Sequence, residues 1–141
     1  MTGTTKDNKQ ILTLVHRHCP DVQAVYRFGS AGTAHERSDS DLDIALLLPP
    51  HSAHRAGTLA LGDLHLALEA ALSRDVDPIN LRLAPSVLQA QIVVTGTRIF
   101  CTDTLLADEF ELLALALYQK LNQERAEIIA EGLDSGSFLA P

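Results

Sequence analysis

Two aspartates at the start of an apolar run constrain this chain more than any other feature. Asp41 and Asp43 follow the turn Gly29-Ser30 after ten intervening residues, in the run FGSAGTAHERSDSDLDIALLL. Side chains in a strand alternate between the two faces of a sheet, so Asp41 and Asp43 are expected to share a face. Two carboxylates on one rigid face suit a hard divalent cation, and a Gly-Ser turn nearby can hold the phosphates that such a cation bridges. The run therefore predicts Mg²⁺-dependent chemistry on a nucleotide.

The order of expected elements indicates an α/β fold. Apolar periodicity and breakers predict helices over 5–18, 53–73, 85–94 and 103–131, and strands over 22–28, 42–48, 76–83 and 98–101. The short link through residues 29–41 favours antiparallel pairing of the first two strands over a parallel crossover. A small mixed sheet with packed helices is therefore expected. We expect a single domain over 1–141, with a core at about 5–102, an acidic helix at about 103–131 and a loose tail over 132–141.

A third carboxylate is expected from the next strand. Two metal ions need more than two carboxylates, and Asp77 lies in the strand predicted over 76–83. Asp75 would share the same face and is the alternative ligand. Pro78 follows Asp77 directly, and proline in a strand is usually confined to an edge or a bulge, which leaves the choice between the two aspartates open. Arg37, in the loop before the paired aspartates, is a candidate for gripping a triphosphate, because a guanidinium group matches phosphate geometry.

Two apolar stripes at helical spacing predict buried helix faces. The stripe of the helix over 53–73 consists of Leu61, Leu64, Leu68 and Leu72. The stripe of the last helix consists of Leu106, Phe110, Leu113, Leu117, Leu121 and Ile128, with a second apolar strip at Leu105, Leu112 and Leu115.

The net charge of −7 is concentrated in one segment. Residues 103–134 hold eight acids and two bases and so carry −6. Binding long DNA or RNA requires the opposite sign, whereas an acidic helix suits a basic protein partner or forms a solvated face. No run approaches the ~20 apolar residues of a membrane span. Cys19 and Cys101 are expected to be reduced thiols in a cytoplasmic protein.

The run Gly29-Ser30, Asp41 and Asp43, with a later strand aspartate, resembles the polymerase-β-type nucleotidyltransferases. The short chain resembles the minimal members of that superfamily, the MNT antitoxins encoded beside HEPN-domain toxins. The resemblance implies a polymerase-β-like fold, with Gly29 and Ser30 on the triphosphate of the nucleotide. It also implies that Asp41, Asp43 and Asp77 are catalytic and bind two Mg²⁺ ions. The implied reaction is the transfer of AMP from ATP to a tyrosine of a partner HEPN ribonuclease, which silences that toxin.

Two other functions are compatible with the same residues. The acceptor could be a small hydroxylated molecule, as in aminoglycoside nucleotidyltransferases, although those enzymes generally carry a further helical region. The chain could also be a binding module that masks a toxin with its acidic helix, without catalysis. Substitution of the aspartates separates the enzyme from the binding module, because only the enzyme needs the carboxylates.

Overall fold

The computed structural model describes residues 2–28, 42–56 and 61–135, and the side chains of 7–28, 42–56 and 61–130. The elements, in chain order, are α1 (Thr2–His18), β1 (Ala24–Phe28), β2 (Leu42–Leu47), α2 (Pro50–Ala56), α3 (Gly62–Leu72), β3 (Val76–Asn80), the short 3₁₀ helix η1 (Leu81–Leu83), α4 (Ser86–Thr95), β4 (Thr97–Cys101) and α5 (Thr104–Ser135). The α/β order expected from the sequence is therefore confirmed.

The strands form one mixed sheet in the order β3-β2-β1-β4. β1 pairs antiparallel with both β2 and β4, which confirms the prediction made from the short link between the first two strands. β2 and β3 are parallel, and the crossover between them contains α2 and α3. β3 is consequently an edge strand, directly beside the strand that begins at Leu42.

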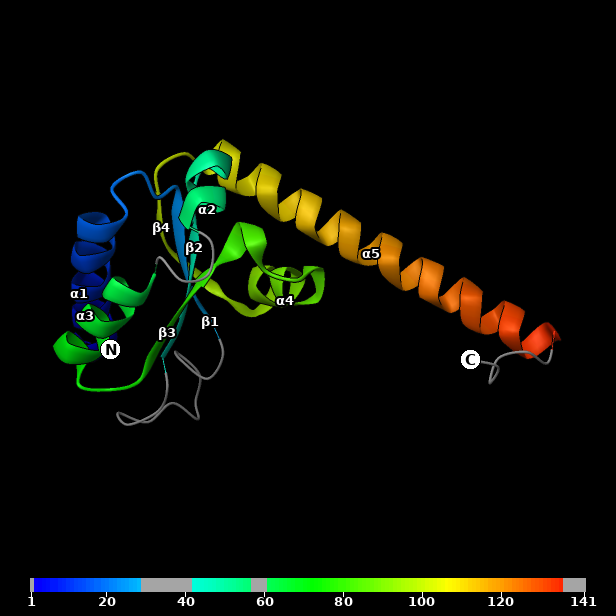
Figure 1. The fold of residues 1–141 in the computed structure, drawn as a ribbon, viewed down its shortest axis with the longest axis horizontal. Coiled ribbons are helices and arrows are strands. Elements are labelled where there is room, and N and C mark those ends of the chain that lie inside the picture. Colours follow the sequence, from blue (N-terminus) through cyan, green and yellow to red (C-terminus); the bar gives the residue numbers. More distant parts are fainter. Residues whose placement is uncertain (1, 29–41, 57–60, 136–141) are drawn as a thin grey trace.

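The two faces of the sheet carry separate apolar cores. Figure 1 shows α1 and α3 on one side of the sheet and α4 and α5 on the other. Alternating strand residues divide between the two sides, as the two-residue period of a strand requires. The core on the α1–α3 side includes Ile11, Val15, Val25, Leu42, Ile44, Leu46, Leu64, Leu68 and Val76. The core on the α4–α5 side includes Ala24, Tyr26, Phe28, Ala45, Leu47, Leu81, Ile92 and Ala107.

The single helix predicted over 53–73 is wrong, because the structure has two helices in this part of the chain. α2 ends at Ala56 and α3 begins at Gly62. The sequence places Gly57 and Gly62 in this span, and glycine costs a helix interior about 1 kcal/mol relative to alanine. α2 also starts earlier than predicted, at Pro50, which suits a first helical position because its φ is already fixed.

β3 is shorter than the strand predicted over 76–83. It ends at Asn80, whose side-chain amide donates a hydrogen bond to the carbonyl oxygen of Ala53 at 2.9 Å. Residues Leu81–Leu83 form η1 instead. Asn80 is buried and ties the end of β3 to α2, a tertiary contact that strand periodicity alone does not reveal.

The last helix begins as predicted and continues further. The Asp103 carboxylate accepts hydrogen bonds from the N–H groups of Leu105 at 2.9 Å and Leu106 at 3.3 Å, which makes it the N-cap. α5 runs to Ser135, so the predicted loose tail is wrong over 132–135, while 136–141 lie outside the described residues. Among the described helices, none is long and apolar enough to cross a membrane.

The prediction that the apolar stripe of α5 is buried is also wrong. Leu106, Leu113, Leu117, Leu121 and Ile128 are all exposed, and only Phe110 of that stripe packs against a core. The buried positions of α5 are instead two small residues, Ala107 and Ala114.

Candidate functional site

Asp43 and Asp77 lie directly opposite each other on neighbouring strands. The parallel register of β2 and β3 pairs Asp43 with Asp77, so the two side chains share one face of the sheet. Neighbouring strands lie only about 4.8 Å apart, which lets two such carboxylates approach one cation. Asp43 is half-buried and Asp77 is exposed. The structure therefore brings together two of the three carboxylates that the sequence singles out.

The carboxylate pair belongs to the sheet face covered by α4 and α5. Asp43 shares a face of β2 with Ala45 and Leu47. Their cross-strand partners, Tyr26 and Ala24, lie in the core on that side. Asp43 itself pairs with Phe28. Because Phe28 is the residue before Gly29, the predicted phosphate turn follows the strand position beside Asp43.

Four predicted site residues lie outside the described residues: Gly29, Ser30, Arg37 and Asp41. Within the described part of the chain, no group of three His, Cys, Asp or Glu side chains could hold a metal ion. The described donors are thus a pair, Asp43 and Asp77, and their hard carboxylate oxygens are the ligand type that Mg²⁺ prefers. The pair fits a Mg²⁺ site that takes at least one further carboxylate from the chain.

Of the two aspartates that the sequence left open, Asp77 is the one paired with Asp43. Asp75 precedes the first paired residue of β3, and its carbonyl oxygen accepts a hydrogen bond from the N–H of Leu42 at 2.8 Å. Asp75 thus contributes a backbone hydrogen bond between β2 and β3, whereas the side chain of Asp77 lies beside that of Asp43.

Pro78 fits β3 because β3 is an edge strand, one of the two positions expected for it. In a parallel ladder, alternate residues of a strand turn their polar groups toward the same neighbour. The backbone carbonyl of Asp75 points toward β2, because it accepts the hydrogen bond from Leu42. The backbone polar groups of Asp77, two residues later, therefore also point toward β2, and the nitrogen of Pro78 points away from it. Pro78 remains in regular register with Ile44. The proline therefore leaves the position of Asp77 intact.

A cavity of about 280 Å³ runs along the outer edge of β3 with Asp77 in its wall. Its other walls are mainly apolar and come from β3, η1, the start of α4 and the residue just before α3. They include Leu61, Pro78, Ile79, Leu83 and Leu88. A carboxylate in an otherwise apolar wall can orient a group that combines an apolar body with a hydroxyl.

A larger cavity, of about 420 Å³, contains none of the predicted site residues. It is lined by residues at the end of α1 and by Leu48, just past the opposite end of β2 from Asp43. Size alone is thus a poor guide in this molecule, and the paired carboxylates identify the better candidate.

Sequence reasoning gave no role to Arg82, which the structure uses to join three elements. Its guanidinium donates to the carbonyl oxygen of Leu48 and, at 2.8 Å, to the side-chain oxygen of Gln23. It also lies 5.6 Å from the ring centroid of Phe110 on α5. Burial lowers the pKa of Arg82 from its usual value. No local pattern around Arg82 predicts these contacts, because its partners are distant in the sequence.

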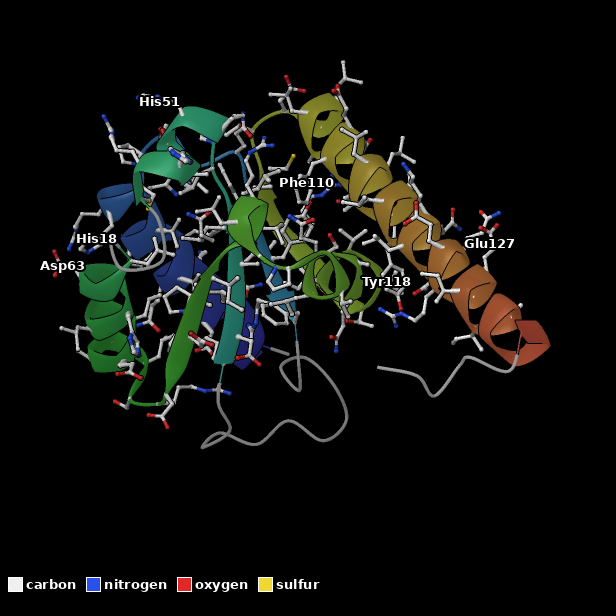
Figure 2. All side chains as sticks on the ribbon, turned by 45° about the vertical axis from the view of Figure 1, so that its right-hand side comes forward. His18, His51, Asp63, Phe110, Tyr118 and Glu127 are labelled. Carbon is white, nitrogen blue, oxygen red and sulfur yellow. The ribbon has the colours of Figure 1, made fainter. Side chains whose placement is uncertain are left out.

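A second polar group joins α5 to the sheet. The Tyr26 hydroxyl donates to a carboxylate oxygen of Glu111 at 2.7 Å, and Arg98 on β4 pairs with the same carboxylate and with Asp108. Burial and the hydrogen bond to Glu111 raise the pKa of Tyr26 above its usual value. Figure 2 shows Phe110 on the side of α5 toward the sheet and Tyr118 beside α4. These contacts position α5 next to the carboxylate-bearing face.

Comparison with known proteins agrees with this geometry. The family model for polymerase beta nucleotidyltransferases matches residues 9–105. A protein adenylyltransferase, MntA of Shewanella oneidensis, is 34% identical over 124 residues, which cover 87% of this chain and 85% of MntA.

Two solved structures share both the fold and part of the sequence. A toxin-antitoxin structure with AMP-PNP has a TM-score of 0.73 and 32% identity, and the match covers 89% of this chain and 98% of the other. A complex of a tri-AMPylated Shewanella oneidensis HEPN toxin with an MNT antitoxin has a TM-score of 0.72 and 31% identity, with 92% of this chain and 98% of the other covered. The fold, the strand positions of the paired aspartates and these similarities lead to one conclusion: the chain belongs to the polymerase-β nucleotidyltransferase family.

Proposed function

We propose that this chain is an antitoxin that transfers AMP from ATP to a tyrosine hydroxyl of a partner HEPN ribonuclease and so neutralises it. Membership of the nucleotidyltransferase family supports the reaction class, and similarity to the adenylyltransferase MntA supports AMP as the group transferred. The AMPylated HEPN toxin in a similar complex supports the acceptor. A cytoplasmic location agrees with the need for ATP and with the free thiols of Cys19 and Cys101.

One observation carries the assignment: Asp43 and Asp77 are register partners at the end of the sheet where β2 and β3 begin. In the proposed site Asp41, Asp43 and Asp77 would hold Mg²⁺, which would neutralise the charge on the phosphates when bound. Gly29 and Ser30 would contact the triphosphate, with Arg37 as a further phosphate ligand.

The proposed step is an in-line displacement at the α-phosphorus. The acceptor oxygen forms a bond to this phosphorus, the bond to the bridging oxygen of the β-phosphate breaks, and pyrophosphate leaves. Asp77 is the carboxylate that takes the proton of the acceptor hydroxyl, since it is the more exposed of the pair and lines the cavity beside β3. Asp43 is half-buried on β2, between β1 and β3, and its proposed role is that of a metal ligand only.

Intact-mass measurement of the toxin tests this proposal. The purified chain, ATP, Mg²⁺ and its proposed HEPN-domain partner should produce toxin heavier by one or more AMP units. Asp77→Asn should lower the rate by about 10²- to 10⁴-fold, the range that a positioned acid or base contributes. Asp75→Asn is the matched control, because Asp75 joins the ladder through its backbone and lies outside the register pair.

The outcomes separate the candidate functions. Equal losses for Asp75→Asn and Asp77→Asn would contradict the choice of Asp77. Neutralisation of the toxin by an Asp43→Asn/Asp77→Asn variant, without any added mass, would identify a masking module instead of an enzyme. Modification of a small hydroxylated compound in place of the toxin would move the acceptor to the second enzyme class.

A further inference from the structure

The apolar surface of α5 is the largest feature that the proposed reaction leaves unexplained. Four leucines and one isoleucine, here called the α5 seam, are exposed along this helix: Leu106, Leu113, Leu117, Leu121 and Ile128. Leu113 and Ile128 retain 64% and 67% of their accessible surface. Leu105 and Leu112 add further exposed apolar surface on the same helix. A contiguous apolar surface of this kind typically marks an interaction site.

The domain supports only the first half of α5. Ala107 and Phe110 pack in the core beside the sheet and Ala114 is buried, whereas every residue over 119–130 is exposed. A helix of 32 residues is about 48 Å long, far longer than the part that the sheet covers. Figure 1 shows α5 passing α4 and then standing clear of the domain, and Figure 2 shows Glu127 on that projecting part.

The spacing of the α5 seam fits a helical partner. The seam advances from Leu106 through Leu113 and Leu117 to Leu121 in steps of seven, four and four residues. With Phe110, four residues after Leu106, the steps become four, three, four and four. Residues at such spacing form one side of a helix and pack against the apolar side of another. The exposed leucines therefore match the surface of a helical protein better than that of a small ligand.

Charge selects a basic partner over a second copy of this chain. α5 contains seven acids and two bases over 104–135, a net charge of −5. Two copies meeting along this helix would bring two such charges together, and like charges across an interface are unfavourable. A partner with an apolar helical side flanked by lysine or arginine would satisfy both the α5 seam and its acidic flanks.

The location of α4 links this surface to the carboxylates. The cavity beside Asp77 is lined at its far end by Leu88 of α4. A second cavity, of about 300 Å³, lies between α4 and Tyr118 of α5 and is lined by Val87. Val87 and Leu88 are adjacent on α4, so this helix contributes to the walls of both cavities. A partner seated on α4 and α5 would thus reach the edge of the sheet where Asp77 lies.

We propose that the α5 seam is the docking surface for the HEPN toxin. The seam binds a basic helical face of the toxin while AMP is transferred. This inference rests on the proposed function for the identity of the partner. It adds that docking and chemistry use different residues: the α5 seam binds the toxin, and the carboxylates at the sheet edge modify it.

Two variants with matched exposure test the docking surface. Leu113→Glu/Leu117→Glu places charge in the α5 seam, whereas Leu66→Glu places it on α3, across the sheet, at a position as exposed as Leu113, with 66% against 64%. Titration calorimetry with the purified HEPN-domain protein should show a Kd raised at least about tenfold by the first variant and unchanged by the second. The KM for toxin should rise in parallel, while the KM for ATP stays constant. Leu113→Ala/Leu117→Ala, which adds no charge, should give a smaller loss in the same direction.

The outcomes distinguish this inference from the proposed function. Unchanged toxin affinity in both seam variants, with AMP transfer intact, would overturn the docking surface and leave the enzyme assignment standing. Toxin binding that the seam variants weaken, without any AMP transfer by the unmodified chain, would support the docking surface and contradict the proposed function. A dimer of the chain alone that the seam variants convert to monomer, with toxin binding unaffected, would show that a second copy occupies the surface.

Discussion

Leucines hold helix α3 against the sheet, whereas alanines and polar contacts hold α5. On α3, Leu64 and Leu68 are buried in the core shared with α1. On α5, the buried positions are Ala107 and Ala114, which allow a close approach but contribute little apolar surface. The two helices thus use their leucines differently, although both carry them at helical spacing.

Polar contacts supply much of what the alanines do not. Asp103 caps α5, Glu111 accepts hydrogen bonds from Tyr26 and Arg98, and Arg82 lies against Phe110. These contacts fix the start of α5, so the exposed leucines of the helix are not needed to hold it in place. The difference teaches that an apolar stripe can serve either the fold or a partner, and that the residues seating the helix decide which.

The largest expected effect is on α3. Leu68→Ala removes a fully buried side chain from the core and should lower the free energy of unfolding by about 2–5 kcal/mol. Urea denaturation followed by circular dichroism measures this change. A loss below about 1 kcal/mol would mean that α3 is seated no more firmly by its leucines than α5 is, and would break the comparison.

A pair of glycines tests how tightly the α4–α5 side is packed. A Cβ on Gly96 would lie 2.5 Å from the carbonyl oxygen of Ile92 and 3.1 Å from that of Arg27, both backbone atoms. Gly96→Ala should therefore destabilise the protein by about 1–3 kcal/mol, because backbone must shift. Gly62→Ala, at the start of α3, is the control, since a Cβ there meets nothing within 4 Å. Equal thermal stability of the two variants would show that the junction of α4 with β1 is looser than the structure indicates.

The Tyr26–Glu111 hydrogen bond should contribute a smaller, pH-dependent amount. Tyr26→Phe should cost about 0.5–1.5 kcal/mol at neutral pH. Because folding raises the pKa of Tyr26 above its usual value near 10, the folded state holds the phenolic proton more tightly than the unfolded chain does. Its contribution is therefore complete below pH 10 and is lost as pH rises above that value. Urea unfolding at pH 8 and pH 11 should show a smaller decline for Tyr26→Phe than for the unmodified chain, and an undiminished decline for Tyr118→Phe.

The smallest expected effect is on the α5 seam itself. Leu113→Ala truncates an exposed side chain and should change the free energy of unfolding by no more than about 0.5 kcal/mol. Set beside Leu68→Ala, it is the most direct test of the comparison. A loss of 2 kcal/mol or more in the isolated chain would mean that this leucine serves the fold and is not reserved for a partner.

Much of the fold was predictable because its signals are local. Strand alternation, the short link over 29–41 and the start of the last helix are set by nearby residues, and the structure agrees with all three. The division of 53–73 into α2 and α3 was missed because leucine periodicity outweighed the glycines in the sequence argument. The roles of Arg82 and Asn80 were missed because their partners lie about 30 or more residues away.

The candidate site was predictable in kind but not in pairing. The spacing of Asp41 and Asp43 and the presence of an acid in a later strand come from the sequence alone. Only the register of β2 and β3 distinguishes Asp77 from Asp75, and only the position of β3 at the sheet edge explains why Pro78 is tolerated. Register is a relation between strands, and no single strand contains it.

By itself the sequence indicated the class of chemistry, because the Gly29-Ser30 pair, the spacing of Asp41 and Asp43 and the presence of Asp77 are covalent facts. The tertiary structure decided which apolar side chains are buried in the core and which remain exposed for a partner to bind. It buried Leu64 and Leu68 of α3 and left the α5 seam exposed, since a helix buries the side that its neighbours leave room for. Periodicity states that a helix has an apolar side; packing alone states what that side meets.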